Sequence, residues 1–181
     1  SSIPRIDERP FDSTRKRINY ATSVDGIVWQ KGGTVLGPES PNVTANYSEG
    51  ADGPGVYKVG TTYYMVFSGR KIVSGDEYQT KILSSDSPNG INWSGGSPAL
   101  NPSGNVSNFD YSNLEAPTVF DEGAAGPEQY KLYYVGNTLD ANGNGHDRIG
   151  LATSQNGTSF GKSLNFAPRV GVAYSFSDKL V

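Results

Sequence analysis

Residues 82–93 read ILSSDSPNGINW, and two other stretches repeat this pattern: INYATSVDGIVW at 18–29 and IGLATSQNGTSF at 149–160. Each stretch combines a short β-prone segment, an Asp-Gly or Asn-Gly pair and an aromatic residue. Asp-Gly and Asn-Gly favour the type I′ turn, whose twist matches that of paired strands, so each stretch is predicted to form a β-hairpin. The aromatic side chain is expected to anchor the outgoing strand on its neighbour.

A second pattern occurs twice between these hairpins. Residues 53–68 read GPGVYKVGTTYYMVFS, and APTVFDEG at 116–123 is followed by YKLYYV at 130–135. Both copies predict an inner strand, near 54–59 in the first and near 116–121 in the second, followed by a turn and a tyrosine-rich strand. The chain is therefore expected to contain at least two copies of one β-sheet unit.

The spacing of the repeats indicates the architecture. Ile82 follows Ile18 by 64 residues and Ile149 follows Ile82 by 67, and a four-stranded unit at this period is typical of a β-propeller blade with long loops. The predicted fold class is all-β, with β-propeller-type blades of four antiparallel strands and fewer than three blades in this chain. The expected layout is a single partial-propeller domain over residues 1–181: outer strands of one blade at 17–37, a blade at 50–100, a blade at 113–165 and the start of a further blade at 168–181.

No segment has sustained helical periodicity, so almost no helix is expected.

Propellers close with about four to eight blades, and open strand edges pair readily with other chains. The chain is therefore interpreted as a fragment or as a protomer that completes its ring by assembly, with a small three-bladed arrangement as the alternative. A homodimer that completes the propeller is the favoured interpretation.

Composition excludes several classes of function. The net charge is −3 and no basic stripe is present, so nucleic acid is not an expected partner. No apolar run approaches the roughly 20 residues of a membrane span, so no membrane is expected either. The chain has no cysteine, which excludes disulfides, thiol nucleophiles and thiolate metal sites. An exported and a cytosolic protein both remain compatible with this composition, and an extracellular or periplasmic location is favoured.

The segments quoted above resemble a known group of enzymes. YATSVDGIVW at 20–29 and GLATSQNGTSF at 150–160 resemble the outer hairpin of the five-bladed propeller glycoside hydrolases, namely the arabinanases, β-xylosidases, invertases and their relatives. DGPGVYKVGTTYYMVFSG at 52–69 resembles the inner strand and its partner in that superfamily. LEAPTVF at 114–120 is similar to its Glu-x-Pro segment, in which the Glu is the general acid.

The resemblance implies a set of catalytic carboxylates. Glu115 matches the general acid, and Asp52, which lies 63 residues earlier, matches the carboxylate that tunes and orients it. The base should come from the inner strand of the preceding blade, where no acid sits in a convincing strand motif. The acids available there are Asp7, Glu8 and Asp12. The third catalytic carboxylate is therefore not found in this chain.

Glycosidic bond cleavage needs a protonated carboxylic acid at the leaving oxygen and a carboxylate opposite it. The acid must keep its proton near neutral pH, and burial or a second carboxylate can raise its pKa; Asp52 beside Glu115 would have this effect. The strand order of a propeller would gather further side chains around them. The candidates for carbohydrate binding are Arg70, Tyr111, His146 and Arg148, with Tyr47, Glu49, Asp76, Glu77, Asn137 and Asp147 on the same face. Ordinary solvated loop residues are the alternative interpretation.

Asp140, Asn142 and Asn144 match the first half of a calcium-binding loop, in which oxygen ligands alternate and a glycine stands sixth. Leu151 stands where a bidentate Glu is expected, so a polar hairpin loop is the alternative, and no cofactor is required.

Two functions stay open. The first is a glycoside hydrolase-like protein that acts on or binds carbohydrate, and the second is a non-catalytic propeller module that binds carbohydrate or another chain.

Overall fold

The fold was established from a computed structural model, which describes residues 15–38, 40, 47–74, 77–123, 125–139 and 145–162. This part of the chain forms ten β-strands and no helix, which confirms the all-β prediction. It accordingly has no helix that is long and apolar enough to cross a membrane. The strands are β1 (Ile18–Thr22), β2 (Gln30–Leu36), β3 (Gly50–Val59), β4 (Thr62–Ser74), β5 (Glu77–Ser87), β6 (Ser97–Leu100), β7 (Asn113–Asp121), β8 (Tyr130–Leu139), β9 (Gly145–Ser154) and β10 (Gly161–Lys162).

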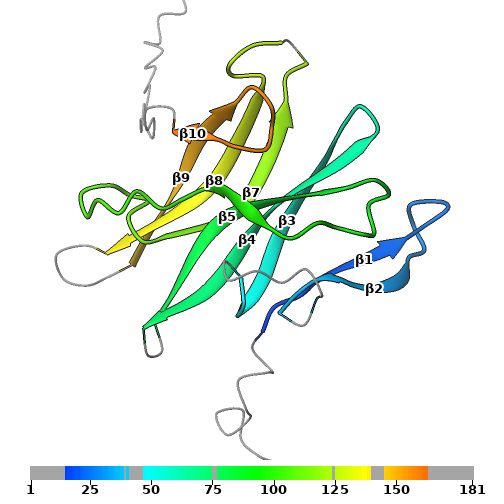
Figure 1. The fold of residues 1–181 in the computed structure, drawn as a ribbon, viewed down its shortest axis with the longest axis horizontal. Coiled ribbons are helices and arrows are strands. Elements are labelled where there is room, and N and C mark those ends of the chain that lie inside the picture. The colour runs from blue at the N-terminus through cyan, green and yellow to red at the C-terminus, as the bar shows by residue number, and fades with distance from the viewer. Residues whose placement is uncertain are drawn as a thin grey trace, which may run out of the picture.

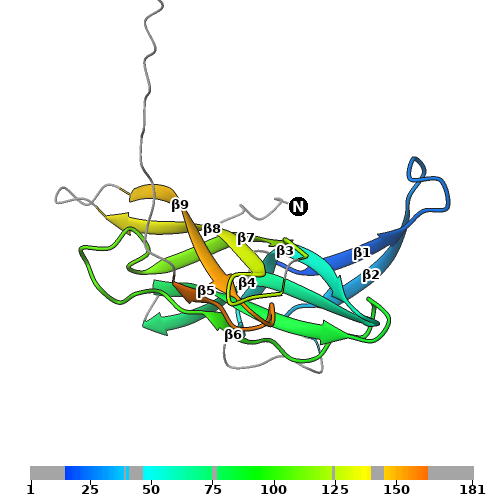
Figure 2. The same ribbon diagram turned by 90° about the horizontal axis from the view of Figure 1, so that it is seen from above.

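The strands form three antiparallel sheets, in which every strand pairs with its neighbours in the sequence. The first sheet contains β1 and β2, the second has the order β3-β4-β5-β6 and the third has the order β7-β8-β9-β10. The two predicted inner strands lie within β3 and β7, at the edges of their sheets. The sheets follow one another in chain order, from the β1–β2 ribbon at one end to β8 and β9 at the other (Figures 1 and 2). Both four-stranded sheets are propeller-type blades.

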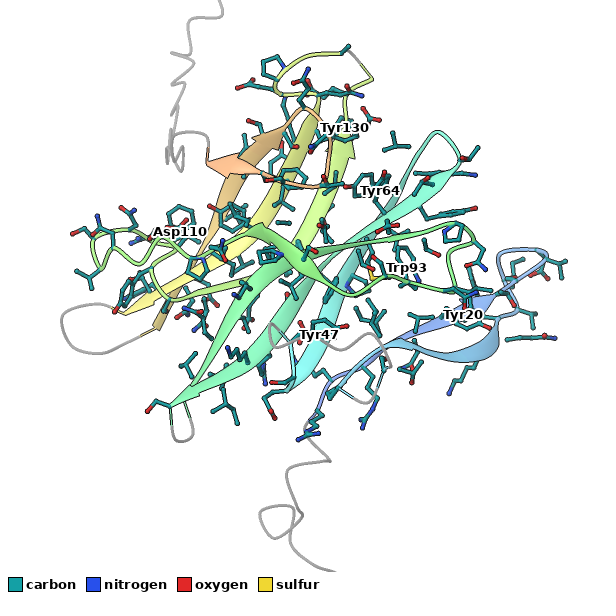
Figure 3. All side chains as sticks on the ribbon, viewed as in Figure 1. Tyr20, Tyr47, Tyr64, Trp93, Asp110 and Tyr130 are labelled. Atoms are coloured by element: carbon teal, nitrogen blue, oxygen red, sulfur yellow. The ribbon has the colours of Figure 1, made fainter. Side chains whose placement is uncertain are left out.

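The second sheet is buried on both faces. Met65, Phe67 and Leu83 pack with Ile18 and Leu36 of the first sheet. Val66 and Ile82, which alternate with them along β4 and β5, pack against the third sheet, whose buried side chains include Leu114, Leu132, Tyr134 and Ala152. Figure 3 labels Tyr47 and Trp93, which belong to the layer shared with the first sheet, and Tyr130, which belongs to the layer shared with the third. Alternate residues of one strand therefore belong to different apolar layers.

The three hairpins contain a longer turn than the sequence suggested. β1 ends at Thr22 and β2 begins at Gln30, so seven residues connect them, not two. The turn glycines have positive φ values of 74° at Gly26, 75° at Gly90 and 76° at Gly157. A type I′ turn also requires positive φ at the preceding residue, but Ala116 is the only non-glycine residue with positive φ in the described part of the chain. The prediction of type I′ turns was therefore wrong.

Side-chain hydrogen bonds stabilise these turns. The hydroxyl oxygen of Ser23 accepts the N–H of Gly26 at 2.9 Å, and Asp25 Oδ1 accepts the N–H groups of Ile27 and Val28 at 2.8 and 2.9 Å. The same bonds recur around Ser87 and Asn89 and around Ser154 and Asn156. Bonds from Val28, Ile27 and Ser23 lower the pKa of Asp25. Ser and Asp or Asn thus satisfy the loop N–H groups, which a two-residue turn would pair across the strands.

The hairpin aromatics anchor one sheet on the sheet before it. Trp93 of the second sheet is 4% exposed and lies in the layer shared with the first sheet. Phe160 of the third sheet is buried against the second, and its N–H donates to the carbonyl of Ala99 at 3.0 Å. Trp29 occupies the same position in the first hairpin but is 60% exposed. No described sheet lies before the first one to cover it.

The inner strands β3 and β7 approach each other backbone to backbone. A Cβ atom on Gly55 would lie 2.9 Å from the carbonyl oxygen of Pro117 and 3.4 Å from the Cα of Thr118. A Cβ atom on Gly53 would lie 3.4 Å from the Cα of Ala116. Glycine at position 55 therefore allows the two sheets to meet along their inner strands.

Replacing Gly55 with Ala is expected to destabilise the protein by about 1–3 kcal/mol, because the methyl group would overlap a backbone oxygen that cannot move without shifting β7. Urea unfolding monitored by circular dichroism measures the change. Gly126→Ala is the matched control, since no heavy atom lies within 4 Å of the point that its new methyl group would occupy. Equal stability of both variants would contradict the close approach.

Candidate functional site

The two inner strands are interrupted at equivalent places. The pairing register of β3 shifts between Asp52 and Gly55, and that of β7 shifts between Glu115 and Thr118. In both strands the acidic residue is followed by a residue with positive φ, 58° at Gly53 and 49° at Ala116, and then by a proline, which cannot donate to the ladder. Asp52 and Glu115 therefore occupy equivalent positions, each immediately before a bulge in adjacent sheets.

The bulge in β7 is held by a buried serine of the neighbouring sheet. Ala116 is a non-glycine residue in the left-handed region, a conformation that costs roughly 1–2 kcal/mol. Its N–H donates to the hydroxyl oxygen of Ser68 at 3.1 Å. Ser68 is 2% exposed and pairs with Asp52 in the β3–β4 register. Ser68 thus connects the two bulges, and strained backbone of this kind is frequent at functional sites.

Glu115 lies in a pocket of about 250 Å³. The pocket is lined by side chains of four strands: Tyr78 of β5, Asn113 and Glu115 of β7, Val135 and Asn137 of β8, and Asp147 of β9. Two carboxylates, two amides and a phenol therefore surround a space about the size of one small polar molecule. This volume is below the roughly 300–1,000 Å³ of complete small-molecule sites.

Hydrogen bonds position the polar groups of this pocket. The buried hydroxyl of Thr80 lies 3.4 Å from Glu115 Oε1 and 3.2 Å from Asn113 Oδ1. It has one proton and can donate to one of them at a time. The N–H of Thr80 also donates to Asn113 Oδ1 at 2.8 Å. On the other side, Asn137 Nδ2 donates to Asp147 Oδ1 at 2.7 Å. Both carboxylates are therefore oriented by neighbouring side chains.

Asp52 has a different environment from the one that the sequence suggested. It is not among the residues that line the pocket, and its carboxylate pairs with the Lys16 ammonium at 2.5 Å. Lys16 precedes β1, and its carbonyl accepts the N–H of Ala51 at 3.0 Å. The segment before the first sheet therefore brings a cation to the carboxylate that was expected to influence Glu115.

The predicted carbohydrate-binding residues are distributed around the pocket. The Arg70 guanidinium lies 4.3 Å from the ring centre of Tyr78, so it contacts a lining residue without lining the pocket itself. Tyr111 is half-buried in the loop before β7. His146 and Arg148 are exposed on β9 on either side of Asp147, and alternation along the strand directs them to the opposite face. The predicted metal ligands Asp140, Asn142 and Asn144, and Asp76, lie outside the described residues.

Sequence reasoning did not single out Tyr78, Thr80, Asn113 or Val135. Asn113 carried a usable signal, because it stands two residues before Glu115 in the same strand and therefore faces the same side. Tyr78 and Thr80 come from the neighbouring sheet. Their proximity depends on how the two sheets are aligned, which no local pattern in the sequence indicates.

Comparisons with known proteins concern the fold. No protein-family model and no curated protein matches the sequence. A solved structure of a BT0996–RGII complex superposes with a TM-score of 0.65 at 14% identity, covering 91% of this chain and 51% of that protein. A structure described as a glycoside hydrolase gives 0.63 at 14% identity, with coverages of 90% and 50%. Zg3597, a family 117 glycoside hydrolase from the marine bacterium Zobellia galactanivorans, gives 0.60 at 17% identity, with coverages of 80% and 41%.

The chain folds like glycoside hydrolases. At these identities the likeness concerns the fold alone, and the chain spans about half the length of the structures that it matches most fully. These comparisons therefore indicate the fold of the chain and not the reaction that the whole protein catalyses.

Replacing Ser68 with Ala is expected to leave the N–H of Ala116 without an acceptor and to destabilise the protein by about 1–3 kcal/mol. Ala116→Gly should be neutral or stabilising, because glycine adopts this φ without steric cost. Urea unfolding of both single variants and the double variant measures the coupling between them. Ser107→Ala, at an exposed serine, is the control. Wild-type stability of Ser68→Ala would contradict the role assigned to this hydroxyl.

Proposed function

We propose that this chain is part of a glycoside hydrolase-like protein that binds a carbohydrate at the Glu115 pocket and cleaves a glycosidic bond, with Glu115 as the general acid. The observation that supports the proposal most is the position of Glu115. It precedes a strained bulge of an inner strand and lies in a pocket that also contains a second carboxylate, within a fold that glycoside hydrolases share.

The proposed chemistry uses the groups of the pocket. Protonated Glu115 gives its proton to the glycosidic oxygen as the bond between that oxygen and the anomeric carbon breaks. Water then adds to the anomeric carbon, and a carboxylate opposite Glu115 accepts its proton. Among the described residues Asp147 meets the chemical requirement for this carboxylate, because it lines the same pocket and Asn137 fixes its orientation. Asp52, held by Lys16, is proposed to maintain the bulge of β3 beside that of β7.

The proposed class of substrate rests on the Glu-x-Pro segment around Glu115. It supports a substrate of the kind cleaved by the arabinanase, β-xylosidase and invertase group, that is, an oligosaccharide with a furanose or xylose-like unit at the scissile bond. Amides and carboxylates in the pocket suit this substrate class, because they hydrogen-bond to sugar hydroxyls.

Glu115→Gln is expected to lower the rate of hydrolysis by about 10²–10⁴-fold, because general acid catalysis contributes about that factor. The substrates to test are arabinotriose and xylotriose, because the sugar alcohol that leaves from them needs the proton of the general acid. Glu128→Gln, which changes an exposed acid in the loop before β8, is the matched control and should keep the wild-type rate. Unchanged hydrolysis by Glu115→Gln would overturn the proposal.

The second candidate is a non-catalytic module that binds carbohydrate. The ion pair between Asp52 and Lys16 favours this candidate. A carboxylate whose charge is balanced by a cation raises the pKa of a neighbouring acid less than an unpaired carboxylate does. The two candidates give different results in the same experiment. A binding module would bind trisaccharides in titration calorimetry, and neither the wild type nor Glu115→Gln would hydrolyse any of them.

We also propose that two copies associate through the outer faces of the first and third sheets. Trp29 of the first sheet is 60% exposed, and Ile149 and Tyr133 of the third sheet are 68% and 44% exposed. Val135 of the Glu115 pocket pairs with Ile149 and faces the same side. A sheet packed on that face would thus lie next to the pocket and could complete it.

Ile149→Asp is expected to weaken self-association, because a carboxylate would be buried in the contact. Sedimentation velocity at micromolar concentrations measures the effect, and Val106→Asp, which replaces an exposed valine in the loop before β7, is the control. A wild-type protein that sediments only as a 19.3 kDa monomer would rule out the homodimer.

A further inference from the structure

A second pocket lies between the second and third sheets, at the other end of β5 from the Glu115 pocket. Its volume is about 360 Å³. It is lined by β4, β5, β6 and the two hairpin loops that follow β5 and β9, with Tyr64, Ser97 and Ser159 among the lining residues. Thr80, which contacts Glu115, and Asp86, which lines this pocket, are six residues apart on β5, or about 20 Å at the rise of a β-strand. The two pockets are therefore separate.

Contacts between the sheets hold the walls of this pocket in place. The Ser84 hydroxyl donates to the carbonyl of Thr158 at 3.1 Å, and the Tyr57 hydroxyl donates to the carbonyl of Gly157. The N–H of Phe160 donates to Ala99 of β6 at 3.0 Å. Three hydrogen bonds therefore hold the hairpin turn of the third sheet, at Gly157, Thr158 and Phe160, against the second sheet beside the pocket.

The polar groups of this pocket fall into two sets. One set is internally bonded: Ser85 donates to the carbonyl of Ser94 at 2.7 Å, and Ser94 donates to Asp86 Oδ1 at 2.7 Å. The other set contains the hydroxyls of Ser97 and Ser159, which form no hydrogen bond with any described residue. These two hydroxyls can both donate and accept, and they come from different sheets across the pocket.

The lining also indicates which ligands fit. No Lys, Arg or His is among the lining residues, so an anionic ligand would find no counter-charge. The one carboxylate is already bonded to Ser94, which disfavours selection of a cation. The ring of Tyr64, stacked on Tyr57 at a centroid distance of 5.7 Å, adds a flat apolar surface beside the hydroxyls. The volume lies within the range of about 300–1,000 Å³ that is typical of small-molecule sites.

We infer that this pocket is a second carbohydrate-binding site, which takes one or two rings of a neutral sugar. Hydroxyl groups that donate and accept, together with an aromatic ring and no cation, match a polyhydroxylated and uncharged ligand. The site does not depend on Glu115, and it would hold a saccharide on the protein whether or not the first pocket is catalytic.

The test uses the Glu115→Gln background, in which hydrolysis of the added sugar is expected to be about 10²–10⁴-fold slower. Amide chemical shifts are followed by NMR while arabinotriose, xylotriose or cellotriose is added. At least one of these is expected to shift the amides of Ser94, Ser97 and Thr158. Ser159→Trp and Ser97→Trp, which fill the pocket at exposed positions, are each expected to weaken that binding at least tenfold. Ser107→Trp, at an exposed serine that lines neither pocket, is the matched control.

Three further tests distinguish loss of the site from misfolding and from non-specific binding. Urea unfolding shows that the tryptophan variants are folded, and Ser159→Ala removes the hydroxyl without adding bulk. Trigalacturonic acid, an anionic probe, is expected to bind at least tenfold more weakly than the best neutral trisaccharide. The inference is overturned if no neutral sugar shifts the amides around this pocket, if both tryptophan variants bind like the control, or if the anionic probe binds equally well. None of these results depends on whether the Glu115 pocket hydrolyses its ligand.

Discussion

The alternation of buried side chains along β4 and β5 is the constraint on which the remaining structure depends. Odd-numbered residues such as Met65, Phe67 and Leu83 pack toward the first sheet, and the intervening Val66 and Ile82 pack toward the third. A slip of one residue in the register would exchange the two sets and misplace every contact on both faces. The central sheet therefore fixes the positions of both neighbours, and with them the positions of the inner strands.

The Glu115 pocket is a consequence of that alignment. Ser68 and Thr80 belong to the face of the central sheet that packs against the third sheet. The Ser68 hydroxyl accepts the N–H of Ala116. The Thr80 hydroxyl can donate to Asn113 Oδ1 or to Glu115 Oε1. The bulge in β7 is thus supported from a different sheet, and its strained residue has no acceptor for its N–H within its own ladder. A site built in this way is positioned by tertiary packing and not by local sequence preference.

Sequence reasoning reached the strands and the sheets because both leave periodic signals. The repeat around the Asp-Gly and Asn-Gly pairs located all three hairpins, and the Tyr-rich segments located β4 and β8. It failed at the turns because the dipeptide preference ignores Ser23, Ser87 and Ser154, whose hydroxyls enter the loop hydrogen bonds. It found Glu115 and its equivalence with Asp52 through a resemblance. The positions of Tyr78 and Thr80 beside Glu115, and of Lys16 beside Asp52, depend on how segments far apart in the sequence are aligned. No local sequence pattern indicates that alignment. The domain boundaries and the catalytic roles stay predictions.

The two tryptophans give this protein two optical probes with different environments. Trp29 and Trp93 each donate an indole N–H to the carbonyl of the turn glycine three residues earlier, at 3.2 and 3.1 Å. Their indole N–H groups are therefore bonded alike, but Trp93 is buried between the first two sheets and Trp29 is exposed to solvent. Emission from Trp93 reports on the packing of the first two sheets, whereas emission from Trp29 reports on whatever covers the outer face of the first sheet. A blue shift without a change in secondary structure would thus identify burial of Trp29, and spectroscopy on the unlabelled protein can separate assembly from folding.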